Sequence, residues 1–134
     1  MKISIVITSI NSIDSRLLSY FDIYNESNII WVGDTKTKKL NESDKRVIDY
    51  DINKQTLEEP NLSSKLPYSH YSRKNLGYVL ALKSGVEFVL DTDDDNFPYD
   101  EYKKFPLFEG GYEIISSQEW VNIYKYFTKS YIWP

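Results

Sequence analysis

The sequence predicts an α/β domain built on a three-layer, Rossmann-like and mostly parallel sheet. Apolar stretches of strand length alternate along the chain with stretches of helical spacing, an order typical of parallel sheets covered by helices. The chain has 134 residues, of which 41% are hydrophobic, and this matches the size and composition of one globular domain. We therefore expect a single domain over residues 1–134.

The first half of the chain contains three candidate strands. Residues 3–7 predict a buried strand, followed by a turn and a helix that Ser12 is placed to cap. Residues 28–32 predict a second strand and residues 46–50 a weaker third. Between residues 51 and 65 we expect an irregular connection with a short helix.

The second half contains the clearest helix. It is predicted from about residue 70 to residue 84, with Ser69 as its N-terminal cap and Gly85 just after its last turn. Residues 86–90 then predict a buried strand that leads into Asp91-Thr92-Asp93-Asp94-Asp95. Ligands of parallel sheets bind beyond the carboxyl ends of the strands, so this acidic segment lies where a site is expected. Further elements are predicted at 112–116 and 116–127.

The composition excludes several classes of protein. Twenty acidic residues against sixteen basic ones give a net charge of -4, and without a basic block we expect no nucleic-acid partner. The chain has no cysteine and a single histidine, so any metal must be held by oxygen ligands. The apolar start of the chain is too short for a signal peptide or a membrane span, so we expect a soluble, cytoplasmic protein.

The acidic segment predicts a divalent metal site. Four aspartates within five residues repel one another, and a bound cation removes that repulsion. Mg²⁺ and Mn²⁺ take one or two carboxylates and complete their shell with waters and substrate phosphates. The candidate ligands are Asp91, Asp93 and Asp95, in two overlapping Asp-x-Asp registers with Thr92 inside the first. The alternative is a solvated acidic turn.

Other oxygen-ligand motifs fit this segment less well. A calcium loop that starts at Asp91 would need glycine at Asn96, an apolar residue at Pro98 and glutamate at Tyr102. A nucleotidyltransferase would need a glycine-rich loop after the first strand, where this chain has no glycine. An aspartyl phosphatase also has an apolar strand that ends in Asp-x-Asp, and it stays open as an alternative.

Two basic residues begin the clearest helix. Arg73 and Lys74 lie where unpaired backbone N–H groups already favour an anion, and together they suit a diphosphate. Gly77, one turn further on, permits close approach of a ligand or a backbone. The alternative is that both basic residues are surface charges and that Gly77 packs on the sheet.

Several motifs together resemble the STELLO-type glycosyltransferases. They are residues 66–78 with the pair Arg73-Lys74 before Gly77-Tyr78, the strand into Asp91-Thr92-Asp93-Asp94, the segment Val32-Gly33-Asp34-Thr35-Lys36-Thr37, and residues 122–127 and 132–134. The likeness spans nearly the whole chain. The sequence is more distantly similar to the reversibly glycosylated polypeptides, sugar-nucleotide mutases whose triple aspartate would match Asp93-Asp94-Asp95.

The resemblance implies a GT-A fold that binds a UDP- or GDP-linked sugar through an Asp-x-Asp site holding Mn²⁺ or Mg²⁺. Asp93 is then the first choice of ligand. The analogy places the nucleoside near Thr8, Ile10 and Asn11, the base or ribose near Asp34, and the diphosphate near Arg73 and Lys74.

The resemblance also implies what lies outside this sequence. The family pattern continues past Trp133-Pro134 into a region that binds a glycan or protein acceptor. We therefore expect a minimal or truncated domain, or one whose other half comes from another chain. A homo-oligomer is also among the expected states. The expected activity is metal-dependent hexosyl or pentosyl transfer, and the alternative is a non-catalytic module that binds a nucleotide sugar.

Overall fold

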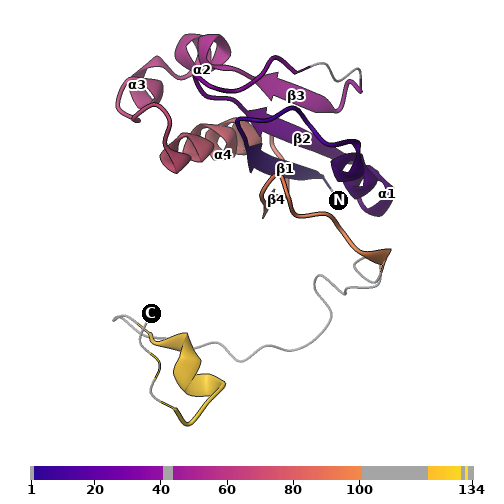
Figure 1. Cartoon of the computed structure of the whole chain (residues 1–134), viewed down its shortest axis with the longest axis vertical. Helices are drawn as coiled ribbons and strands as arrows, with labels where there is room; N and C mark the ends of the chain where they lie inside the picture. Colours follow the sequence, from indigo (N-terminus) through magenta and orange to yellow (C-terminus); the bar gives the residue numbers. More distant parts are fainter. Residues whose placement is uncertain (1, 41–43, 101–120, 131, 133–134) are drawn as a thin grey trace.

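The computed structural model describes residues 2–40, 44–100, 121–130 and 132, and Figure 1 shows an α/β arrangement in them. The elements are, in chain order, β1 (Ile3–Thr8), the 3-10 helix η1 (Ser15–Ser19), α1 (Tyr20–Ile23), β2 (Ser27–Val32), β3 (Val47–Tyr50), α2 (Ile52–Glu58), α3 (Pro60–Ser63), the 3-10 helix η2 (Tyr71–Arg73), α4 (Lys74–Lys83), β4 (Phe88–Asp91) and the 3-10 helix η4 (Ile123–Tyr126). The strand predicted at 112–116 and the start of the helix predicted at 116–127 lie outside the described residues.

Within the described residues, the sheet has four parallel strands in the order β3-β2-β1-β4. Strand β1 pairs with β2 from Ile3↔Ser27 to Thr8↔Val32, and on its other side with β4 from Ile3↔Phe88 to Val6↔Asp91. The chain therefore leaves β1 toward one edge of the sheet and returns to its other side with β4. This reversal makes the carboxyl ends of β1 and β4 the switch point of the sheet, and open α/β sheets bind ligands in the crevice at such a point.

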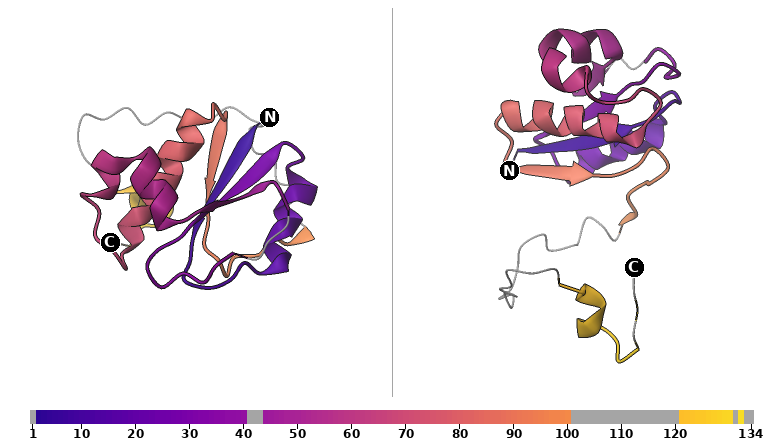
Figure 2. Two further views of the ribbon diagram at one scale, coloured as in Figure 1. Left: turned by 90° about the horizontal axis from the view of Figure 1, so that it is seen from above. Right: turned by 90° about the vertical axis from the view of Figure 1, so that its left-hand side faces the viewer.

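Helices cover both faces of the sheet, as the left view in Figure 2 shows, and this confirms the predicted layers. Alternate residues of β1 point to opposite faces. Ile3, Ile5 and Ile7 pack in one core with Leu17, Tyr20 and Phe21 of η1 and α1. Val6 packs in the other core, together with Ile30 and Val32 of β2 and Leu76 and Ala81 of α4.

Two helix caps differ from the prediction. The first helix begins after Asp14, whose carboxylate accepts a hydrogen bond from the Arg16 amide at 2.9 Å, and not after Ser12. The predicted helix over 70–84 forms as η2 followed by α4, but its cap is the His70 ring, which accepts from the Ser72 amide at 3.0 Å. Ser69 has a φ of 51° and so lies in the left-handed region, where it does not cap the helix.

The strand that carries the acidic segment is less buried than predicted. Phe88 and Val89 of β4 are each 37% exposed, because β4 is the edge strand of the four described. The apolar run predicts a buried strand, because composition alone does not distinguish an edge strand from a central one. Among the described helices, none is long and apolar enough to cross a membrane.

Candidate functional site

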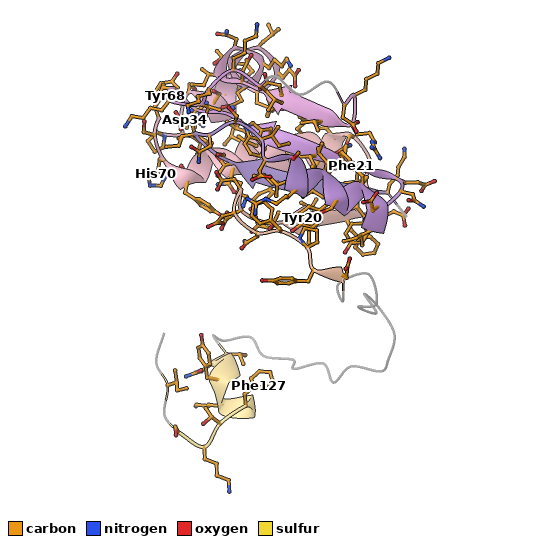
Figure 3. The ribbon with its side chains drawn as sticks, turned by 45° about the vertical axis from the view of Figure 1, so that its right-hand side comes forward. Tyr20, Phe21, Asp34, Tyr68, His70 and Phe127 are labelled. Carbon is orange, nitrogen blue, oxygen red and sulfur yellow. The ribbon has the colours of Figure 1, made fainter. Side chains whose placement is uncertain are left out.

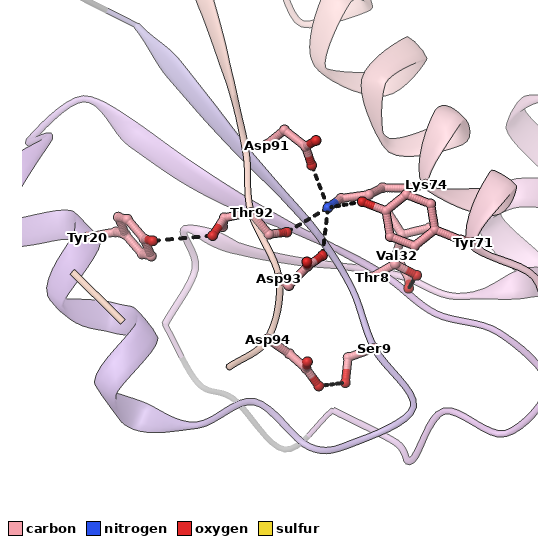
Figure 4. A network of polar contacts seen from close by, with 10 residues as sticks. All are labelled: Thr8, Ser9, Tyr20, Val32, Tyr71, Lys74, Asp91, Thr92, Asp93 and Asp94. Atoms are coloured by element: carbon pink, nitrogen blue, oxygen red, sulfur yellow. Dashed lines mark hydrogen bonds and ion pairs between the residues drawn. The ribbon is translucent and has the colours of Figure 1, made fainter. Parts of the chain in front are cut away.

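The crevice between β1 and β4 brings together the residues that follow both strands. The amide of Thr92 donates to the carbonyl oxygen of Val6 at 3.4 Å, so the two chains stay adjacent as β4 ends. Helix α4 begins at the same edge of the sheet with Lys74. Figure 4 shows the polar side chains that meet there.

Lys74 is the centre of this cluster. Its ammonium forms an ion pair with Asp91, lies 3.2 Å from Oδ1 of Asp93 and 2.6 Å from the carbonyl oxygen of Thr92, and donates to the Tyr71 hydroxyl at 3.0 Å. The Lys74 side chain is 1% exposed, whereas those of Asp91 and Asp93 are 55% and 52% exposed. The two carboxylates therefore share one buried cation and keep their outer sides in contact with solvent.

The surroundings keep Lys74 charged and Tyr78 neutral. Burial alone would lower the pKa of Lys74, but hydrogen bonds to Asp91, Tyr71 and Asp93 outweigh it and raise that pKa above its usual value. Burial, together with a hydrogen bond to Asp91, raises the pKa of Tyr78 to about 12. At neutral pH Lys74 is therefore positively charged and the Tyr78 phenol is neutral.

Asp94 ties the loop after β1 to the loop after β4. Its Oδ2 accepts from the Ser9 hydroxyl and, at 3.1 Å, from the side-chain amide of Asn11. The Ser9 hydroxyl also accepts from the Asn11 backbone amide at 2.8 Å. The aspartate that the sequence analysis did not select as a ligand therefore closes one side of the crevice.

A hollow of about 310 Å³ continues from the crevice toward the loop after β2. It is lined by Thr8, Ser9, Ile10, Asp34, Lys36, Ser69, His70 and Tyr71. Figure 3 shows Asp34, Tyr68 and His70 at the same end of the domain. Of the residues assigned to the nucleoside by resemblance, Thr8, Ile10 and Asp34 line this hollow, and Asn11 lies beside Ser9.

A network of short hydrogen bonds holds Asp34. Its amide donates to the Thr37 hydroxyl at 2.7 Å, and that hydroxyl donates to the Ser9 carbonyl oxygen at 2.6 Å. Its carboxylate accepts from the Thr35 amide at 2.6 Å. The loops after β1 and β2 are thereby joined, which fixes one wall of the hollow.

We expect Asp34 to make the stability of the fold depend on pH. Burial raises the pKa of Asp34, but the backbone N–H groups of Ser69, Thr35 and His70 and the charge of Arg73 outweigh it and bring the pKa below its ordinary value. A lowered pKa stabilises the fold above the unfolded value of about 4, and this stabilisation is lost as the pH falls through the folded value.

Urea unfolding of the wild type and of Asp34→Asn tests this dependence. The stability difference between the two proteins should be largest near pH 7 and should shrink below about pH 4, as the wild-type carboxylate becomes protonated. A difference that stays constant from pH 7 to pH 2.5 would show that the charge of Asp34 does not stabilise the loop.

Arg73 does not face the crevice. Its guanidinium is fully buried and donates to Oε1 of Gln55 at 2.6 and 3.0 Å, to the Ser63 hydroxyl at 2.9 Å and to the Leu66 carbonyl oxygen at 3.2 Å. It also lies 4.7 Å from the centre of the Tyr68 ring. The predicted contact of Arg73 with a diphosphate is therefore not formed here, because its donors hold the loop between α3 and η2.

Gly77 packs on the sheet. A Cβ at this position would lie 2.5 Å from a methyl carbon of Val32 and 2.6 Å from one of Val6. The glycine therefore lets α4 approach β1 and β2 closely, and the interpretation of Gly77 as a ligand contact was wrong. The packing alternative accounts for it.

The structure favours one of the two Asp-x-Asp registers. Asp91 and Asp93 meet at Lys74, whereas Asp95 lines a separate hollow with Arg16, Phe97 and Pro98. In the part of the chain that the structure describes, no three acidic or histidine side chains are placed to share a metal ion. Of the three predicted ligands, the structure thus brings Asp91 and Asp93 together. Thr92 contributes its carbonyl oxygen to the cluster, and its hydroxyl lies 3.4 Å from the Tyr20 hydroxyl.

Three contributors to the site were missed in the sequence analysis. Ser9 lies between the predicted Thr8 and Ile10, Tyr71 precedes the predicted pair Arg73-Lys74 by two residues, and Asp94 lies between the predicted ligands Asp93 and Asp95. A polar residue directly after a central strand is a signal that would have identified Ser9. The Tyr71 contact depends on the 3-10 turn that precedes α4, which the helical pattern does not reveal.

Fold and crevice define this chain as an α/β protein with a polar site at the reversal point of a parallel sheet. Comparison with family models, with curated proteins and with solved structures finds no match for the chain.

Proposed function

We propose that the chain binds a nucleotide-diphosphate sugar in the crevice between β1 and β4 and acts as a glycosyltransferase domain of the GT-A type. The observation that carries this proposal is the meeting of Asp91, Asp93 and Lys74 at the reversal point of a sheet ordered β3-β2-β1-β4. Carboxylates and an ammonium side by side suit a ligand that brings both phosphates and a cation.

The donor atoms at this site fit a divalent cation. Oδ1 of Asp93, a carboxylate oxygen of Asp91 and the Thr92 carbonyl oxygen all converge on one point, now held by the Lys74 ammonium as a stand-in cation. Hard oxygen ligands of this kind are the ones that Mg²⁺ and Mn²⁺ prefer. When bound, such an ion neutralises the charge that develops on a leaving diphosphate. Asp91 and Asp93 are the residues that would hold it.

The protein's own residues have separate roles in this proposal. Lys74 supplies a positive charge at the diphosphate position, and its burial holds that charge in place before a ligand arrives. The hollow lined by Thr8, Asp34 and His70 adjoins this position and is proposed for the nucleoside. No residue is proposed as the catalytic base.

We expect UDP or GDP, or one of their sugars, to raise the melting temperature by several degrees when Mn²⁺ is present. A ligand at one hundred times its Kd stabilises the folded state by about 2.7 kcal/mol. Asp93→Asn should weaken this binding at least tenfold. Asp95→Asn is the matched control, because it removes the same charge two residues away, in a different hollow.

The outcomes of this titration separate the proposals. If no nucleotide binds, or if Asp95→Asn weakens binding as much as Asp93→Asn, then the crevice is not the nucleotide-binding site. Binding without hydrolysis or transfer of the sugar favours the second candidate, a non-catalytic nucleotide-sugar-binding module.

One observation supports that second candidate. Among residues 2–40 and 44–100, the carboxylates placed at the crevice and its adjoining hollow are already engaged. Asp91 and Asp93 pair with Lys74, Asp94 accepts from Ser9 and Asn11, and Asp34 accepts from backbone amides. A general base needs a carboxylate free to take a proton from the acceptor hydroxyl.

A further inference from the structure

The Lys74 ammonium occupies the point at which the oxygen ligands of the crevice converge. Two carboxylates, one peptide carbonyl and one phenol surround it, and the side chain is almost fully buried. A small cation bound at that point would contact the same Asp91 and Asp93 oxygens. The Lys74 ammonium and the small cation cannot both bind tightly at that point, because their two positive charges would repel each other.

The position of Lys74 on its helix strengthens this competition. Lys74 is the first residue of α4, the end of a helix that repels positive charge. The helix N-terminus therefore disfavours the ammonium, and the pairing with Asp91 and Asp93 is what offsets this effect. In the absence of another anion, we therefore expect Lys74 to stay paired with Asp91 and Asp93.

The carboxylates themselves remain within reach of solvent. More than half of each aspartate side chain is exposed, although the oxygens that face Lys74 are taken. An ion from solvent can therefore approach both groups from outside, but it meets two carboxylates whose charge the Lys74 ammonium has already reduced by one unit.

We propose that Lys74 and a divalent metal ion compete for the facing oxygens of Asp91 and Asp93, so that the protein's own cation pairs with these carboxylates until a metal ion displaces it. This inference deepens the proposed function, since it concerns the same carboxylates, and it makes Lys74 a residue that sets metal affinity. When a donor diphosphate binds as proposed above, it gives the Lys74 ammonium another anion to pair with.

A titration of the metal-stripped full chain with Mn²⁺ tests the competition without any nucleotide. Free Mn²⁺ is measured by its electron paramagnetic resonance signal, for the wild type and for Lys74→Met. We expect the variant to bind Mn²⁺ at least tenfold more tightly, because both carboxylates lose their internal partner. Adding Asp93→Asn to Lys74→Met should remove this gain.

Lys83→Met is the matched control. Lys83 lies at the other end of α4, where it pairs with Glu59, so this variant makes the same change in net charge away from the crevice. Its Mn²⁺ affinity should stay within about twofold of the wild type. A similar gain in Lys83→Met would attribute the effect to net charge and would overturn the proposal.

The result that contradicts the competition is equal Mn²⁺ affinity in the wild type and in Lys74→Met. Circular dichroism and the melting temperature establish that each variant is folded. If Lys74→Met does not fold, the Mn²⁺ affinity of Lys74→Gln is compared with that of the wild type instead, since the glutamine amide can still donate to the Thr92 carbonyl oxygen. Because no nucleotide is present, a failure of the proposed function leaves this result unaffected.

Discussion

Replacing Arg73 by methionine is expected to lower the free energy of unfolding by about 3–5 kcal/mol. The guanidinium is fully buried, and four of its hydrogen bonds join Gln55 to Ser63 and one reaches Leu66. Methionine fills much of the space but donates no hydrogen bond. Each buried acceptor left without a donor costs about 1–3 kcal/mol, and Gln55 and Ser63 would both lose theirs.

Urea unfolding at neutral pH measures this loss. Arg16→Met is the control, because the Arg16 side chain is 67% exposed and solvent screens its ion pair with Asp14. Arg73→Lys should recover little of the stability, since a lysine cannot present two donors to Gln55 at once. A loss below about 1 kcal/mol in Arg73→Met would mean that this network does not hold the loop between α3 and η2.

Gly77→Ala is expected to destabilise the fold by about 2 kcal/mol, which is the second large effect. Overpacking costs about 1–3 kcal/mol, and the new methyl group would clash with both Val32 and Val6, which are themselves fully buried. Alanine is the better helix former by about 1 kcal/mol, and this offsets part of the cost. To relieve the clash, α4 must move away from the sheet and take Lys74 with it.

Two measurements separate this displacement from a simple loss of stability. Leu82→Ala, on the exposed side of the same helix, should change the unfolding free energy by no more than about 0.5 kcal/mol. Under conditions where Gly77→Ala is folded, it should also alter Mn²⁺ affinity, because the ammonium no longer meets Asp91 and Asp93. A Gly77→Ala protein as stable as the wild type would show that α4 can shift without cost.

The elements that the sequence predicted best are those with a strong local pattern. The strands β1 and β2 and the helix that became η2 and α4 lie where alternation and spacing placed them, because local spacing determines which face each side chain occupies. The caps were wrong at Ser12 and Ser69. Several serines compete near each helix start, and the choice among polar residues depends on how the preceding loop packs.

For the candidate site, the sequence predicted that the acidic segment follows a strand but did not distinguish the contacts of Arg73 from those of Lys74. Arg73 and Lys74 are neighbours with the same charge, and spacing treats them alike. Successive residues of a helix point about 100° apart, so one reaches the loop after α3 and the other reaches β4. Contacts between residues 18 positions apart decide which of the two basic residues holds a loop and which one reaches the acidic segment. They are the contacts of Arg73 with Gln55 and of Lys74 with Thr92. Such contacts leave no periodic signal.

The short strand β4 gives the Lys74 cluster a further consequence. Two apolar residues of this strand, Phe88 and Val89, are partly exposed, so burial alone specifies its alignment against β1 weakly. Asp91 ends this strand and Asp93 lies two residues further on, and Lys74 pairs with both. A slip of one residue would turn Asp91 to the other face of the sheet and break its ion pair with Lys74. The same ion pairs that make the crevice polar therefore also fix the register of β4 against β1.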